Sequence, residues 1–252
     1  MAEAVKIPEF GYRYIPGPFQ YSAGVAALPG FRIERLRFAE MVPLDVGFAR
    51  IERHLADAGL ATTAFCACEL RSPAPFTDEG FKAFNRQYVG TLERWGIVKG
   101  HANPVARSNV CPAIDPPVVP SFHAFSIVVP SSNAAKSFVI AGSGEAQEGH
   151  GLYAERTVRY GDTSPQAMRD KAVFVLGEME RRLALLSGSW TADTTATQVY
   201  TVHELHHFLE DEIVRRKAAR HGLTWHFARP PVIDLEYEMD CRAVHVEQVL
   251  EG

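Results

Sequence analysis

The sequence predicts an α+β protein made of two tandem modules, each a mixed β-sheet with two helices packed on one face. The order strand, helix, strand, helix, strand occurs twice along the chain, and at one constant offset Pro117 aligns with Pro230. A short linker of small and polar residues at 130–136 separates the two series, as expected at a domain boundary. We therefore expect one module over 1–130 and a second over 137–252.

Composition excludes several classes of protein. Of the 252 residues, 46% are hydrophobic and 22% charged, which is typical of a chain with a large buried core. The net charge of −4 argues against binding to nucleic acid or to an anionic membrane. No apolar run is long enough to span a bilayer, and the first residues lack the pattern of a signal peptide. We therefore expect a cytoplasmic protein.

The first module is defined by its hydrophobic spacing. Alternating residues predict strands at 31–38 and 122–129, and a nearly continuous apolar run predicts a strand at 62–70. Apolar residues at helical spacing predict helices at 48–58 and 77–95, each followed by glycine. Because the 62–70 strand is apolar on both faces, we expect a second sheet to cover it, which favours a homo-oligomer.

The second module repeats this order. We expect strands at 138–141, 195–202 and 235–244 and helices at 164–186 and 205–218. Ser164 and Pro165 are typical N-cap and first-turn residues of a helix. The four cysteines are too few for a disulfide scaffold, so we interpret them as small buried side chains.

Five short motifs then carry a resemblance to a known family. They are Pro-Phe-Gln-Tyr-Ser-Ala-Gly-Val at 18–25, Phe-Asn-Arg-Gln-Tyr at 84–88, Pro-Val-Ala-Arg-Ser at 104–108, Phe-Val-Ile-Ala-Gly-Ser-Gly at 138–144 and Leu-Glu-Tyr-Glu at 235–238. In this order the chain resembles the RidA/YjgF (L-PSP) imine deaminases, as a tandem duplication. The resemblance implies RidA/YjgF-like, chorismate-mutase-like modules that assemble as a trimer.

The same resemblance implies an enzyme of the hydrolase class. Its reaction would be hydrolytic deamination of an imine or enamine that carries a carboxylate, with release of ammonia. A 2-imino acid and an aminomuconate-type intermediate are both substrates of this kind. The expected partner is thus a small-molecule carboxylate, with no nucleic acid, membrane, metal or organic cofactor involved.

The resemblance assigns four catalytic residues. Arg107 would hold the substrate carboxylate through two hydrogen bonds, Glu238 would orient or deprotonate water, and the Tyr21 and Ser22 hydroxyls would position the imine or the water. The substrate-binding residues that it implies are Ser108, Asn85, Gly142, Glu145 and Arg220.

Neither half matches the family completely. Phe125 stands where the first half would carry the glutamate, and His221 follows Arg220 where the second would carry serine. Arg107 of one module and Glu238 of another would then meet across an interface, or one site per chain has been lost. Whether one, both or neither module is competent stays open, and a non-catalytic small-molecule-binding protein is an alternative.

A metal-dependent hydrolase is a further alternative. His203-Glu204-Leu205-His206-His207 fits H-E-x-x-H, in which two histidines one helical turn apart bind zinc and the glutamate activates water. The motif, however, begins where the 195–202 strand ends, whereas zinc binding needs both histidines inside one helix. We therefore favour a site without metal.

Overall fold

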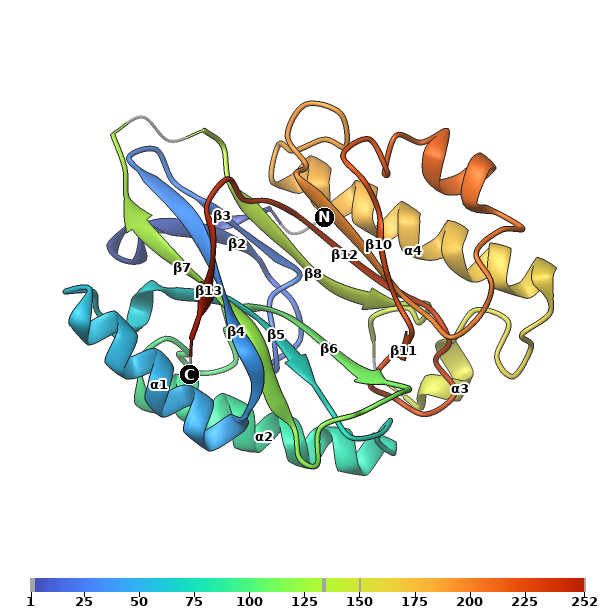
Figure 1. Ribbon diagram of the computed structural model, residues 1–252, viewed down its shortest axis with the longest axis horizontal. Coiled ribbons are helices and arrows are strands. Elements are labelled where there is room, and N and C mark those ends of the chain that lie inside the picture. Colours follow the sequence, from blue (N-terminus) through green and yellow to red (C-terminus); the bar gives the residue numbers. More distant parts are fainter. Residues whose placement is uncertain (1–2, 133–134, 150, 252) are drawn as a thin grey trace.

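Two β-sheets form the centre of the protein, and helices cover their outer faces (Figure 1). The computed structural model describes residues 3–132, 135–149 and 151–251. The strands are β1 (Val5–Ile7), β2 (Tyr12–Ile15), β3 (Gly24–Ala27), β4 (Phe31–Pro43), β5 (Phe65–Arg71), β6 (Ala106–Pro112), β7 (Ser121–Pro130), β8 (Phe138–Gly144), β9 (Ala196–Tyr200), β10 (Thr224–His226), β11 (Ala228–Arg229), β12 (Glu238–Ala243) and β13 (Glu247–Leu250). The helices are α1 (Leu44–Asp57), α2 (Asp78–Arg94), α3 (Tyr153–Arg156) and α4 (Pro165–Leu185), with short turns η1 (Pro8–Phe10), η2 (Thr62–Ala64) and η3 (Leu209–Val214).

The first sheet has seven strands in the order β1-β2-β3-β8-β12-β9-β10. Neighbouring strands run antiparallel except β9 and β10, which run parallel. Helix α4 covers its outer face and buries a row of apolar side chains that includes Val175, Leu176 and Met179. The Ser164 hydroxyl accepts from the backbone N–H of Ala167 and so caps this helix, as the sequence indicated.

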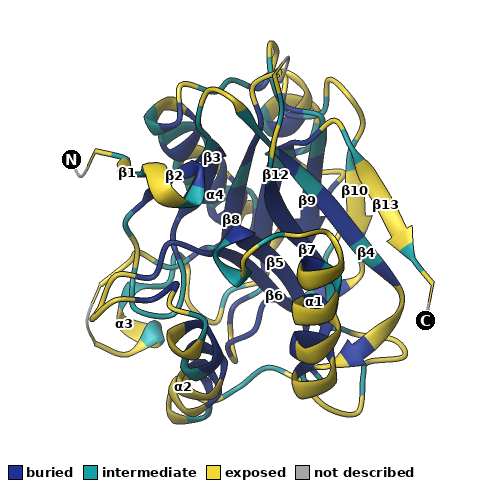
Figure 2. Ribbon diagram, turned by 90° about the vertical axis from the view of Figure 1, so that its left-hand side faces the viewer, coloured by how far each residue is buried: buried dark blue, intermediate teal, exposed yellow. Residues whose placement is uncertain are grey.

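The second sheet has six strands in the order β11-β6-β5-β7-β4-β13. Helices α1 and α2 cover its outer face, where Phe48, Tyr88 and Phe125 belong to one hydrophobic cluster. The inner faces of the two sheets meet in another cluster that contains Tyr12 and Cys66. β5 is buried along its whole length, as expected for a strand covered on both sides (Figure 2).

The prediction of two RidA-like modules, each with its own sheet and two helices, is wrong. β3 from the beginning of the chain pairs with β8, so strands from both halves make the seven-stranded sheet. β13 from the end of the chain pairs in parallel with β4, and β11 pairs with β6. Exposed strand edges in one half therefore take their hydrogen-bonding partners from the other half.

The second half also differs in its helices. Helix α4 matches the expected helix at 164–186, but of the expected helix at 205–218 only a π-helical segment, η3, forms, with turns on either side of it. Leu205, Phe208 and Ile213 are nevertheless buried against the α4 side of the sheet. Among the described residues, none of the helices is long and apolar enough to cross a membrane.

Candidate active site

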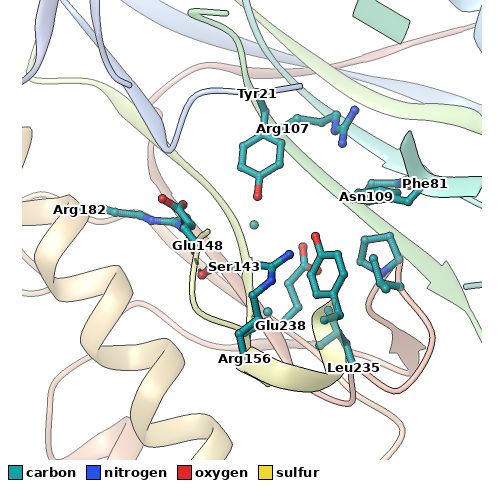
Figure 3. Close-up of a pocket in the computed structure, with 16 residues that line it drawn as sticks. Tyr21, Phe81, Arg107, Asn109, Ser143, Glu148, Arg156, Arg182, Leu235 and Glu238 are labelled. Atoms are coloured by element: carbon teal, nitrogen blue, oxygen red, sulfur yellow. Dashed lines mark hydrogen bonds and ion pairs between the residues drawn. The ribbon is translucent and has the colours of Figure 1, made fainter. Parts of the chain in front are cut away.

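A pocket of about 560 Å³, including its open mouth, takes its walls from both sheets (Figure 3). The six-stranded sheet contributes β6, the seven-stranded sheet contributes β8 and the start of β12, and α2, α3 and α4 supply further side chains. The polar lining residues are Tyr21, Arg107, Asn109, Ser143, Glu148, Tyr153, Arg156, Arg182 and Glu238.

Arg107 on β6 is a buried cation that forms no ion pair with the residues that the structure describes. Its Nη2 donates to Asn85 Oδ1 at 2.7 Å, and its Nη1 has no hydrogen-bond partner among the described residues. Four aromatic rings surround the guanidinium, and that of Tyr88 is the nearest, at 4.8 Å from Cζ to ring centroid. Such rings stabilise a cation only in part, so this environment favours binding of an anion from outside.

Glu238, the first residue of β12, supplies an acidic group to the same pocket. Burial and the neighbouring Asp240 and Glu145 carboxylates raise its pKa well above the ordinary range of a glutamic acid. The side chain lies over Gly142, where any Cβ would overlap Glu238 Oε1. This contact places the carboxyl in the pocket, and the raised pKa favours its protonated form, which suits a general acid.

Tyr21 adds a hydroxyl donor that points into the pocket (Figure 3). Burial raises the pKa of Tyr21, so the phenol keeps its proton. Arg182 on α4 is also buried, but it pairs with Glu148 at 2.9 Å and donates to the Ala141 carbonyl at 3.1 Å. Of the lining residues, Arg107 and Arg156 form no ion pair within the described part of the chain.

The structure brings Arg107, Glu238, Tyr21 and Gly142 together, all from one chain. An interface between two molecules is therefore not needed to join Arg107 to Glu238. Asn85 lies behind Arg107 and fixes its guanidinium through the bond described above.

Four other predicted site residues lie elsewhere. Ser22 donates to the Pro104 carbonyl at 3.0 Å, and Ser108 donates to Asp240 Oδ2 at 2.6 Å, both outside the pocket wall. Glu145 pairs with Lys171 at 3.2 Å and accepts from two backbone N–H groups that precede β12. Arg220 is exposed on a turn after η3.

Sequence reasoning missed Asn109, Arg156 and Arg182. Strand alternation could have identified Asn109. Residues two apart on a strand share a face, and Asn109 follows Arg107 by two residues on β6. Its Oδ1 accepts from Ser72, and its Nδ2 has no partner in the described ranges. No motif singled out the two arginines.

The histidine motif does not form a helical pair. His203 bonds Glu236 at 2.8 Å, whereas His206 and His207 are exposed in turns before η3. Within residues 3–132, 135–149 and 151–251, no group of three or more His, Cys, Asp or Glu side chains is arranged to hold a metal ion.

Comparison with known proteins corrects the family. The model of the family described as 2-aminomuconate deaminase CnbZ matches residues 4–248. A 2-amino-5-chloromuconate deaminase from Comamonas testosteroni is 54% identical over 252 residues, which cover 99% of this chain and 100% of that protein. The resemblance to RidA/YjgF proteins, and with it the tandem repeat of RidA modules, is therefore wrong.

Solved structures with a similar arrangement are distant. A chorismatase is 12% identical with a TM-score of 0.41, covering 88% of this chain and 77% of its own. A cyanuric acid hydrolase is also 12% identical, with a TM-score of 0.44 and coverage of 88% and 69%. The match of the family model across almost the whole chain is decisive: this protein is an enzyme, a deaminase, and belongs to the 2-aminomuconate deaminase CnbZ family.

Proposed function

We propose that this enzyme hydrolyses the enamine of a 2-aminomuconate-type substrate and releases ammonia. One observation carries the proposal: an unpaired guanidinium, Arg107, and a buried carboxyl with a raised pKa, Glu238, line the same pocket. The first group suits a substrate carboxylate, and the second suits proton transfer to and from carbon and water. The names of the family and of the Comamonas relative agree with this chemistry.

The substrate class determines what the pocket must do. A 2-aminomuconate is a six-carbon diene with a carboxylate at each end and an amino group on C2. Hydrolysis replaces that C–N bond with a carbonyl: the enamine and one water give a 2-oxo acid and one ammonia. The reaction proceeds by proton transfers, addition of water and loss of ammonia, with no net oxidation.

Glu238 is the proton donor in the first step that we propose. Its carboxyl protonates a carbon of the diene, and the nitrogen lone pair forms the C=N bond of an iminium ion. The resulting Glu238 carboxylate then accepts a proton from water as the water oxygen bonds to C2. Glu238 passes this proton to nitrogen, the C–N bond breaks, and the proton of the new hydroxyl returns to Glu238 as ammonia leaves and the carbonyl forms.

Arg107 would hold the carboxylate on C1, next to the reacting carbon. A guanidinium forms two parallel hydrogen bonds to a carboxylate, which fixes both position and orientation. Binding there would give Nη1 the partner that it lacks within the described protein. The Tyr21 hydroxyl would donate to substrate or to the attacking water.

The test is ammonia release from freshly generated 2-aminomuconate by wild type, Arg107→Gln and Glu238→Gln. We expect Glu238→Gln to lower kcat by about 100-fold or more and Arg107→Gln to lower kcat/KM by about 10-fold or more. Arg159→Gln is the matched control, because Arg159 is half exposed, pairs with Asp162 and does not line the pocket. Wild-type rates in both pocket variants, or no ammonia release by wild type, would refute the proposal.

A further inference from the structure

We infer that Arg156 binds the second carboxylate of the substrate and thereby makes the enzyme selective for dicarboxylates. This inference rests on the proposed function, since it assigns the far end of the same substrate. Arg107 and Arg156 come from different elements, β6 and α3, and both line the pocket. Two guanidiniums that form no ion pair within the described residues match a ligand with two carboxylates.

The surroundings of Arg156 favour an external anion. Its Nη1 donates to the Gln147 carbonyl, and its Nε is buried without a hydrogen-bond partner among the residues described. Leaving a buried N–H donor without a partner costs free energy, which a hydrogen bond to a bound carboxylate would recover. Figure 3 shows the guanidinium of Arg156 extending into the pocket.

Tyr153 holds this guanidinium in place. The Arg156 Cζ atom lies 4.0 Å from the centroid of the Tyr153 ring, three residues earlier on α3. A guanidinium stacked on an aromatic ring keeps its edge free for in-plane hydrogen bonds. The stack therefore presents donors of Arg156 to a carboxylate without the entropy cost of ordering a free side chain.

Arg182 does not fit the same role. Its guanidinium is ion-paired with Glu148 and lies 4.0 Å from a Glu178 oxygen, so its charge is already compensated.

Arg156 also lies at the boundary of the pocket. It lines, together with Phe81 and Tyr153, a second cavity next to the pocket.

The test uses two stable probes that differ by one carboxylate. trans,trans-Muconate has a carboxylate at each end of a six-carbon diene, whereas sorbate has the same diene with a single carboxylate. Neither has an amino group, so binding is measured by calorimetry without turnover. We expect wild type to bind muconate about 10-fold or more tightly than sorbate.

Substitution of Arg156 then removes this difference. We expect Arg156→Gln to weaken muconate binding to the level of sorbate while leaving sorbate binding unchanged. Arg156→Lys keeps the charge but loses the planar pair of N–H donors of a guanidinium. It should therefore keep only part of the preference for muconate over sorbate. Arg159→Gln, with the same loss of charge outside the pocket, should bind both probes as wild type does.

Several results would overturn the inference. One is equal affinity of wild type for the two probes, and another is no binding of muconate at all. The third is a loss of affinity in Arg156→Gln that is equal for muconate and sorbate. Thermal unfolding checks that the variant is folded. If muconate is preferred through Arg156 but wild type releases no ammonia from 2-aminomuconate, then the proposed reaction fails and the binding assignment stands. If ammonia is released without this preference, only the present inference fails.

Discussion

The carboxyl group of Glu238 lies directly over the α-carbon of Gly142, in the space that a β-carbon would fill. The two residues belong to adjacent antiparallel strands, β12 and β8, and the contact fixes where the acidic group sits in the pocket. Any side chain at residue 142 must displace Glu238.

Gly142→Ala should therefore impair catalysis by displacing the Glu238 carboxyl, because Oε1 of Glu238 is the atom nearest to the new β-carbon, with the α-carbon of Ser108 next to it at 3.2 Å. Displacement of an acidic group by about 1 Å costs on the order of 100-fold in rate. Ammonia release measures the loss. Gly90→Ala on α2, where a β-carbon meets nothing, serves as control and should keep full activity. Equal activity of the two variants would contradict the placement of Glu238.

Glu238→Gln should change the pH dependence of stability. The pKa of Glu238 is raised by burial and by Asp240 and Glu145, so the folded state holds a proton that the unfolded state releases. Between the unfolded pKa and the raised folded pKa, wild type must lose stability as pH increases. Glutamine resembles the protonated acid and does not titrate, so the advantage of Glu238→Gln in melting temperature should grow with pH across that window. A difference that is constant with pH would argue against the raised pKa.

Asn85 is a positioning residue for Arg107, and two substitutions separate its roles. Asn85→Ala removes the bond to Arg107 Nη2 and should raise KM by about 10-fold with a smaller change in kcat. Asn85→Asp keeps an acceptor but adds an anion, which would pair with Arg107 and compete with the substrate carboxylate. We expect Asn85→Asp to bind muconate more weakly than Asn85→Ala. The reverse order would show that Arg107 does not receive a carboxylate.

Arg35 and Glu69 form a bidentate ion pair between the sheets, with distances of 2.6 and 2.9 Å. Burial alone would raise the pKa of Glu69, but Arg35 holds it well below the ordinary value. Stability from this pair is therefore present above the unfolded pKa and is lost as pH falls toward the folded one. Glu69→Gln should lower the free energy of unfolding by about 3–5 kcal/mol at neutral pH. Denaturant unfolding measures this change. The double variant Arg35→Met/Glu69→Leu should lose less; a larger loss would contradict this account.

Local pattern predicted much of the secondary structure but not how it assembles. Ser164 caps α4 as the sequence indicated, and Thr77, the first residue of the expected helix at 77–95, caps α2 through a bond from Gly80. The pairing of β3 with β8 and of β4 with β13 depends on strand edges far apart in the sequence, which periodicity does not record.

The pocket residues, too, were predictable only in part, because local motifs mark some of them and not others. Arg107 and Glu238 were found from motifs on strands, even though the family inferred from those motifs was wrong. Arg156 lies on a four-residue helix in a long connection, where no regular spacing marks it. Glu145 carries a charge that appears available in the sequence, but Lys171 from α4 neutralises it in the core.

The pocket joins Tyr21, from near the beginning of the chain, to Glu238, from near its end. During synthesis on the ribosome, the nascent chain therefore cannot assemble this pocket until almost all of it has been translated. Premature termination before β12 would give a polypeptide that retains Arg107 and lacks the acid.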